Sequence, residues 1–92
     1  MDYTRLMQKT VNFIEGRLTT HIELEDIADV ANFSMFHFHR MFMVVVDTTP
    51  KDYIRRRRLS KAARELVFTS RPISEIATSY QFVSQASFTR IF

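Results

Sequence analysis

The chain has 92 residues, a net charge of +3 and 46% apolar residues, with one Gly, two Pro and no Cys. This length suits one compact domain or two very small ones that share a helix, and so few turn residues leave little room for a many-stranded sheet. The lack of Cys excludes a disulfide framework and a thiolate metal site, and it fits a reducing cytoplasm. No run approaches the ~18 apolar residues of a membrane span, and the N-terminus does not resemble an export signal. We therefore expect a helical, cytoplasmic protein.

Positive charge is concentrated in the middle of the chain. Between residues 51 and 71, eight Lys or Arg stand against two acidic residues, which gives this segment +6 and leaves −3 on the rest. A basic segment in an otherwise acidic chain is typical of a protein that binds a polyanion. A solvated helix face has the same composition, so charge alone leaves both interpretations open.

Hydrophobic periodicity predicts helices over residues 3–18 and 23–31, each with apolar residues at three- to four-residue intervals. Asn32 follows the second helix, and Asn tolerates the left-handed backbone conformation that ends a helix. Ser34 can then cap a third helix over residues 35–46 by accepting a hydrogen bond from a free amide.

Thr49 and Pro50 mark the start of a long basic helix, because Thr is a good N-cap and Pro suits the first helical position. This helix runs to about Phe68 and is about 28 Å long at 1.5 Å per residue. Pro72 starts a short helix, and Ser84 caps a final one that reaches the end of the chain.

Two segments of the chain resemble each other, with an offset of 49 to 50 residues. Each has Ile-Ala, a turn position, Phe, a capping Ser and then Phe-x-Arg-x-Phe, ending at residues 42 and 92 respectively; the second has one extra residue in its turn. This pattern is typical of a helix-turn-helix, because two steeply crossing helices need a small residue where they touch. We expect Ala28 and Ala77 at the crossings, with Phe33 and Phe82 at the corners.

An ordinary helical hairpin, used twice for packing, is the alternative to a DNA-reading unit. Two copies in register, joined by a basic helix, favour DNA. The sequence thus predicts an all-α fold with two helix-turn-helix subdomains joined by a long central helix, a homeodomain-like bundle. We expect the subdomains at residues 1–48 and 70–92, the second apparently truncated at its C-terminus, and the linking helix at residues 49–69. The linker would separate the two readers by about one turn of B-DNA, ~34 Å, so that one chain can occupy two successive major grooves.

The most specific stretch of the second unit comprises Ile76-Ala77, Phe82, Ser84-Gln85 and Phe88-Thr89-Arg90-Ile91-Phe92. Support comes from Thr49-Pro50, Tyr53-Ile54-Arg55, Arg58-Leu59 and Ala62. With these residues the chain resembles the DNA-binding domain of the AraC/XylS family of bacterial transcription regulators. The resemblance implies binding to double-stranded DNA without a cofactor, contact with RNA polymerase, and an effector-binding or dimerisation domain elsewhere in the parent protein. The family usually has Gly where this chain has Asn32 and Gln81, and its pattern continues past Phe92.

The exposed face of the first reading helix is expected to carry Met35, Phe36, His39 and Arg40. The resemblance implies base contacts from the last three. The Arg40 guanidinium suits guanine O6 and N7, and the Phe36 ring suits a thymine methyl. Core packing is the alternative for Phe36, because this helix is rich in Phe.

In the second unit, base contacts are expected from Gln85, Ala86, Thr89 and Arg90; a salt bridge is the alternative for Arg90. Ser34 and Ser84 are expected to cap their helices, and such a cap also points amides at a phosphate.

The run of four Arg in the linking helix sweeps about 300° around the helix axis, so its members cannot all face one way. With Leu59, Ala62, Ala63 and Leu66 on a buried face, Arg55 would point toward that face, so it needs a carboxylate partner or must extend its charged head to water. The residues expected opposite that face are Arg57, Arg58, Lys61 and Arg64. The expected phosphate contacts from this helix are Arg57, Arg58 and Lys61.

An enzyme is not expected, because there is no Gly-rich phosphate loop, activated Ser or Cys setting, or carboxylate pair in a cleft. His37 and His39 would project about 200° apart on a helix, which does not suit a shared metal ion. The serious alternative to DNA binding is a helical interaction module that keeps the fold but contacts RNA polymerase or a partner regulator.

Overall fold

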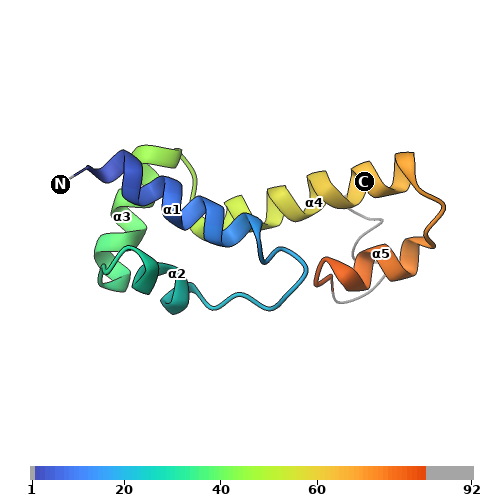
Figure 1. Cartoon of the computed structure of the whole chain (residues 1–92), viewed down its shortest axis with the longest axis horizontal. Coiled ribbons are helices and arrows are strands. Elements are labelled where there is room, and N and C mark those ends of the chain that lie inside the picture. Colours follow the sequence, from blue (N-terminus) through green and yellow to red (C-terminus); the bar gives the residue numbers. More distant parts are fainter. Residues whose placement is uncertain (1, 83–92) are drawn as a thin grey trace.

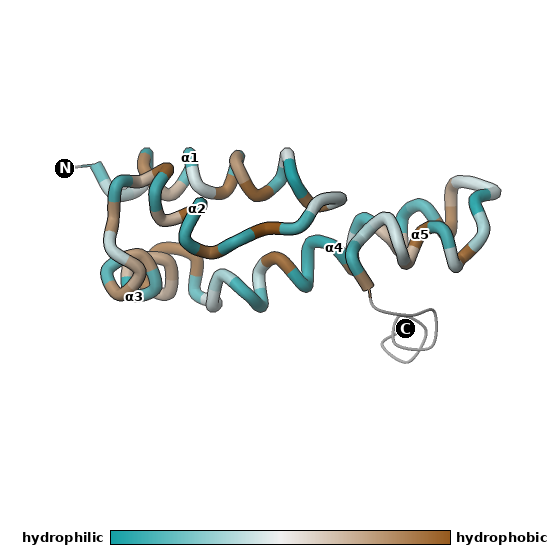
Figure 2. The backbone as a smooth tube through the Cα atoms, turned by 90° about the horizontal axis from the view of Figure 1, so that it is seen from below, coloured by the Kyte–Doolittle hydropathy of each residue, from teal (hydrophilic) through white to brown (hydrophobic). Residues whose placement is uncertain are grey.

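The computed structural model describes residues 2–82, and every regular element within them is an α-helix (Figure 1). The helices are α1 (Tyr3–Glu15), α2 (Leu24–Val30), α3 (Met35–Val46), α4 (Pro50–Phe68) and α5 (Ile73–Ser79). Helices α1, α2 and α3 pack together at one end of an elongated molecule of 45 × 21 × 20 Å, and α4 leads to α5 at the other end (Figures 1 and 2). The predicted all-α fold with a long central helix is confirmed. No helix in residues 2–82 is long and apolar enough to cross a membrane.

Local sequence signals position most of the helix starts. The Ser34 hydroxyl accepts a hydrogen bond from the amide of His37 at 3.2 Å, and the Thr49 hydroxyl accepts one from the amide of Asp52 at 3.1 Å. Both bonds satisfy amides that a helix leaves unpaired in its first turn. Pro50, which has no amide hydrogen to satisfy, begins α4 as predicted.

The first helix is shorter than the prediction of residues 3–18. It ends at Glu15, because Gly16 begins a series of turns that brings the chain back toward α2. The amide of Arg17 already donates to the carbonyl of Ile14 at 2.9 Å, three residues back rather than four. Leu18 is buried all the same, so the periodicity identified a core residue that lies beyond the helix.

One continuous core runs through the molecule and includes residues of all five helices. Phe38 and Phe42 of α3 are fully buried, and their rings meet edge to face with centroids 5.6 Å apart. Each such side chain contributes roughly 1.5–3 kcal/mol when it leaves water. Ile54 and Ala62 extend the core along α4, so the linking helix belongs to both units.

The turn of the first unit ends α2 with a left-handed residue. Asn32 has a φ of 59°, and its amide donates to the carbonyl of Asp29 at 3.0 Å. The next amide, that of Phe33, donates to the carbonyl of Ala28 at 3.0 Å. This pair of bonds is the Schellman arrangement, which satisfies the last carbonyls of the helix.

The second unit repeats these two hydrogen bonds and the left-handed residue at equivalent positions, as far as the described residues extend. Gln81 has a φ of 68°, its amide donates to the carbonyl of Thr78 at 3.1 Å, and the amide of Phe82 donates to that of Ala77 at 3.0 Å. The crossing residues Ala28 and Ala77 are 2% and 1% exposed. Gln81 therefore adopts the same turn as Asn32, although Gln has no special tolerance for it.

Candidate nucleic-acid interface

Helix α3 presents one face to solvent that carries the residues expected to read DNA. Phe36 is 72% exposed, Arg40 is exposed, and Met35 and His39 are half-buried. The guanidinium carbon of Arg40 lies 5.7 Å from the centroid of the Phe36 ring, within the range of a cation–π contact. The exposure of Phe36 excludes core packing, the alternative that the Phe-rich sequence had left open.

The exposed face of α3 continues past the residues that the sequence singled out. Met43 is 44% exposed and Val44 is 75% exposed. Together with Met35, Phe36, His39 and Arg40 they line a shallow open hollow of about 640 Å³. Their positions, four residues after His39 and Arg40, place them one helical turn further along the same face, a signal that was present in the sequence.

The opposite face of α3 holds the helix firmly against the rest of the molecule. Phe42 packs edge to face on the ring of Tyr53 from α4, with centroids 5.7 Å apart. Near the start of α3, the His37 ring stacks on Phe33 with centroids 4.2 Å apart, and Tyr3 of α1 lies edge-on to it. His37 thus belongs to an aromatic cluster. No group of metal-ligating side chains occurs within residues 2–82.

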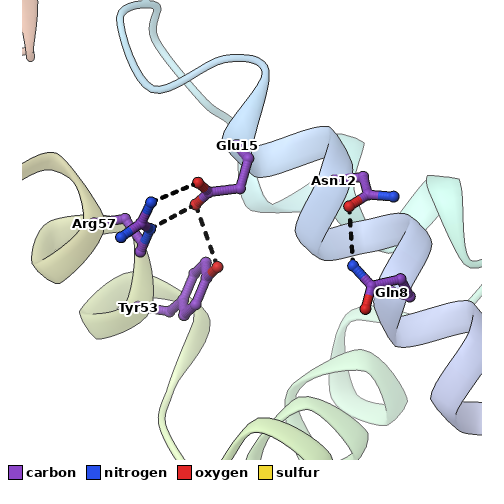
Figure 3. A network of polar contacts seen from close by, with 5 residues as sticks. All are labelled: Gln8, Asn12, Glu15, Tyr53 and Arg57. Carbon is purple, nitrogen blue, oxygen red and sulfur yellow. Dashed lines mark hydrogen bonds and ion pairs between the residues drawn. The ribbon is translucent and has the colours of Figure 1, made fainter. Parts of the chain in front are cut away.

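Arg57 of α4 is engaged with α1. Its Nε and Nη2 donate to the two carboxylate oxygens of Glu15, each at 2.9 Å, and the Tyr53 hydroxyl donates to the same carboxylate at 3.2 Å (Figure 3). Arg57 lowers the pKa of the Glu15 carboxyl through these hydrogen bonds and its charge, although partial burial opposes it. Burial and the neighbouring carboxylate raise the pKa of Tyr53.

Arg58 is engaged with the turn that follows α1. Its Nε donates to the carbonyl of Leu18 at 2.9 Å, and its Nη2 donates to the carbonyl of Thr20 at 2.7 Å. Burial lowers the pKa of Arg58. The prediction that Arg57 and Arg58 lie on the exposed side of α4 is wrong, because α1 and its turn cover that side. Both guanidiniums hold the fold together, and their expected contacts with phosphate remain predictions.

Other basic residues of α4 remain open to solvent. Lys61, the third expected phosphate contact, is exposed. Arg55 is also exposed, which agrees with the second alternative expected for it, a charged head that extends to water. With Lys51, Arg55 lines a groove of about 640 Å³ that also includes Tyr80 and Gln81 of the second unit. These cations lie where α4 passes between the two units.

Arg71, in the loop between α4 and α5, forms another ion pair and bridges the two helices. Arg71 donates to the Glu65 carboxylate at 2.8 Å and to the Ser79 hydroxyl at 2.7 Å. Burial, together with the Glu65 carboxylate, raises the pKa of Tyr80 to about 12. The sequence did not predict this arrangement. It has the same three residue types, Glu, Arg and Tyr, as the cluster between α1 and α4.

The expected contacts of the second reader lie outside the described residues. They are Ser84, Gln85, Ala86, Thr89 and Arg90. Their predicted contacts with DNA remain predictions. The described part of the second unit supplies the buried Ala77 of α5 and the turn at Gln81, which precede this segment in the sequence.

The crossing of α2 and α3, the repeated turns and the exposed face of α3 define a protein of the helix-turn-helix class. A family model described as a helix-turn-helix domain matches residues 27–92. The chain is 49% identical to the uncharacterized HTH-type transcriptional regulator YbfP of Bacillus subtilis strain 168, over 100% of this chain and 31% of that protein. It is 36% identical to the regulatory protein SoxS of Escherichia coli K12, over 100% of this chain and 86% of that protein.

Solved structures share the fold. The chain superposes on a transcriptional regulator of Chromobacterium violaceum with an AraC-type DNA-binding domain, with a TM-score of 0.84 and 24% identity over 96% of this chain and 82% of that one. It also superposes on the DNA-binding domain of AdpA, solved with a target DNA, with a TM-score of 0.80 and 23% identity over 92% of this chain and 80% of that one. The chain belongs to the AraC family of helix-turn-helix transcriptional regulators. It spans about a third of the length of YbfP.

Proposed function

We propose that this chain binds double-stranded DNA in a sequence-specific manner to regulate transcription in the cytoplasm of a bacterium. In this proposal α3 and the segment 84–92 read two successive major grooves. The observation that carries it is the face of α3, where Phe36 and Arg40 are exposed and His39 is half-buried, while Phe38 and Phe42 on the other side of the helix are fully buried. A rigid helix with an exposed polar and aromatic face is what major-groove recognition requires.

The dimensions of the molecule support reading two grooves. Its long axis of 45 Å exceeds the ~34 Å that separates successive major grooves on one side of B-DNA. The AdpA domain, which has the same fold, was solved with its target DNA. One chain could then bind an asymmetric site without forming a dimer.

Each expected contact has a defined chemistry. Arg40 would donate two hydrogen bonds to guanine, and Phe36 would contact a thymine methyl. His39 would donate to or accept from a base edge. Lys61 would neutralise a phosphate, and the amides at the start of α3, near Ser34, would face another.

The test is a series of mobility shifts at increasing salt, with a duplex that the wild-type protein selects from a random library. We expect affinity to fall as salt rises, by ~0.9 log units per log unit of salt for each phosphate contact. Arg40→Ala should lose about 1–3 kcal/mol of binding without loss of stability, because a bidentate base contact disappears and the side chain is exposed. Lys9→Ala, which removes an exposed charge from α1, is the matched control. Binding that is unaffected by salt and by Arg40→Ala would contradict the proposal.

A second function, contact with RNA polymerase or a partner regulator, is favoured by the apolar end of the α3 face. Val44 and Val45 are 75% and 39% exposed, and such side chains suit a protein partner better than a phosphate backbone. Val44→Ser should then weaken binding to purified RNA polymerase while leaving affinity for DNA unchanged. Equal polymerase binding by the variant and the wild type would argue against this contact.

A further inference from the structure

Three consecutive carbonyls of the turn between α1 and α2 accept hydrogen bonds from distant parts of the chain. Arg58 donates to the carbonyls of Leu18 and Thr20, at 2.9 and 2.7 Å. Between them, the carbonyl of Thr19 accepts a hydrogen bond from the side-chain amide of Gln81 at 3.1 Å. In both views this turn lies next to the end of α5 (Figures 1 and 2). The turn of the first unit is therefore tied at once to the linking helix and to the second unit.

Gln81 occupies a backbone conformation that its residue type does not favour. Its φ of 68° lies in the left-handed region, where Gly is at ease and Asn is tolerated because its short side chain can bond locally. The equivalent residue of the first unit, Asn32, meets this requirement. Gln81 does not, but its longer side chain reaches 62 residues back along the sequence to Thr19. The side chain thus makes a contact between units that a Gly could not make.

We propose that Gln81 and Arg58 form a clamp on the turn at residues 18–20, and that this clamp fixes the second unit relative to the first. The inference rests on the proposed function, because the consequence of the clamp is a set spacing between the two DNA readers. Gln81 is thus a positioning residue and need not touch DNA. Arg58 holds the turn in the place where Gln81 can reach it.

The main effect of the clamp is on the relative orientation of the two units, and its effect on the free energy of folding is small. A hydrogen bond between exposed groups adds little to folding. Two linked DNA-binding units, however, gain affinity from each other only if both can occupy their grooves at the same time. If their relative orientation is already fixed in the free protein, less conformational entropy is lost on binding. Without the clamp, the second unit can adjust to other spacings, and binding to the correct spacing becomes weaker.

The chain offers a matched pair of substitutions. Gln81→Gly and Asn32→Gly each place Gly, which adopts a left-handed backbone conformation without strain, in equivalent turns. Only Gln81→Gly also removes the side-chain amide that donates to the Thr19 carbonyl. Gln81→Asn keeps a residue that tolerates the turn and shortens the side chain by one methylene. It therefore serves as a second clamp variant if Gln81→Gly alters folding.

The first readout uses two duplexes, one selected by the wild-type protein from a random library and one with a base pair inserted between its halves. The insertion rotates the halves by about 35° relative to each other. We expect the wild type and Asn32→Gly to prefer the selected duplex by on the order of tenfold. Gln81→Gly and Gln81→Asn should lose most of this preference. Clamp variants that keep the full preference would overturn the proposal.

The second readout needs no DNA, so it separates a failure of the clamp from a failure of the proposed function. The chain has no native Cys, and spin labels can be placed at Lys9→Cys on α1 and Ser74→Cys on α5, both exposed positions. The distribution of label distances should be narrow in the wild type and Asn32→Gly and broader in both Gln81 variants. Equally narrow distributions in all four proteins would refute the clamp, whatever the protein binds.

Discussion

Glu15 of α1 and Arg57 of α4 form a two-pronged ion pair, with both nitrogen–oxygen distances at 2.9 Å. The two residues are 42 positions apart in the sequence, and the pair ties the linking helix to the first unit. Their side chains are 29% and 35% exposed, so solvent weakens the pair without removing its geometric advantage. This relationship gives Arg57 a role in holding the fold, whereas its expected contact with DNA remains a prediction.

Arg57→Gln should therefore destabilise the protein and leave its salt-dependent DNA binding nearly unchanged. We expect the free energy of unfolding, measured in urea, to fall by about 1–2 kcal/mol, because the Glu15 carboxylate loses two charge-assisted hydrogen bonds. Lys61→Gln is the control. It should change stability by no more than about 0.5 kcal/mol and reduce the salt dependence of binding by ~0.9 log units per log unit. A small change in stability together with a reduced salt dependence in Arg57→Gln would show instead that Arg57 contacts a phosphate.

Because of the same ion pair, the free energy of unfolding should decrease as the pH falls. Arg57 holds the pKa of Glu15 below 4.5, so the carboxylate contributes stability above the ordinary pKa and loses it as the pH falls through the lowered one. Urea unfolding at about pH 6 and at successively lower values down to about pH 3 should show less acid loss in Glu15→Gln than in the wild type. Some loss should remain, because hydrogen bonds from Tyr80 and Arg71 also lower the pKa of Glu65. Identical acid loss in both proteins would exclude the effect.

Tyr80 should ionise only at high pH. Burial and the Glu65 carboxylate raise its pKa to about 12, so its contribution to stability is complete below the ordinary pKa of 10 and is lost as the pH rises toward 12. Titration of the phenolate ultraviolet absorbance should show a late step near pH 12. Tyr80→Phe should lack this step, and Tyr3→Phe should keep it. A difference between wild type and Tyr80→Phe confined to the region near pH 10 would contradict this assignment.

The small buried residues of α2 and α5, Ala28 and Ala77, should not tolerate enlargement. Ala28 and Ala77 are 2% and 1% exposed, and a larger side chain there must displace a packed helix. We expect Ala28→Leu and Ala77→Leu each to lower the free energy of unfolding by about 1–3 kcal/mol. Ala63→Leu, at a half-buried position of α4, should change it by about 0.5 kcal/mol or less. Equal effects at all three positions would show that the crossings are not tightly packed.

Local chemistry made the helices and turns predictable. The caps at Ser34 and Thr49 and the start at Pro50 depend on residues within three positions of one another. The turn at Asn32 follows from the left-handed tolerance of Asn. The turn at Gln81 was predictable only through the internal repeat, because its residue type does not favour that conformation.

The contacts of α4 were not predictable, because they depend on partners far away in the sequence. Helical periodicity gives the angle at which Arg57 and Arg58 leave the helix, but it does not show that Glu15 and the turn after α1 lie in their path. Whether Phe36 is exposed or buried could not be predicted from the sequence for a similar reason. Several Phe residues share α3, and only its packing against α1 and α4 decides which of them face solvent.

Protection of guanine N7 against methylation tests the central claim most directly, because this atom lies in the major groove. On a duplex selected by the wild-type protein, the account predicts two protected clusters centred about 10 base pairs apart on one face of the DNA. Arg40→Ala should lose protection in one cluster and keep it in the other. A single protected cluster, or two clusters on opposite faces of the duplex, would contradict the claim that one chain reads two successive major grooves.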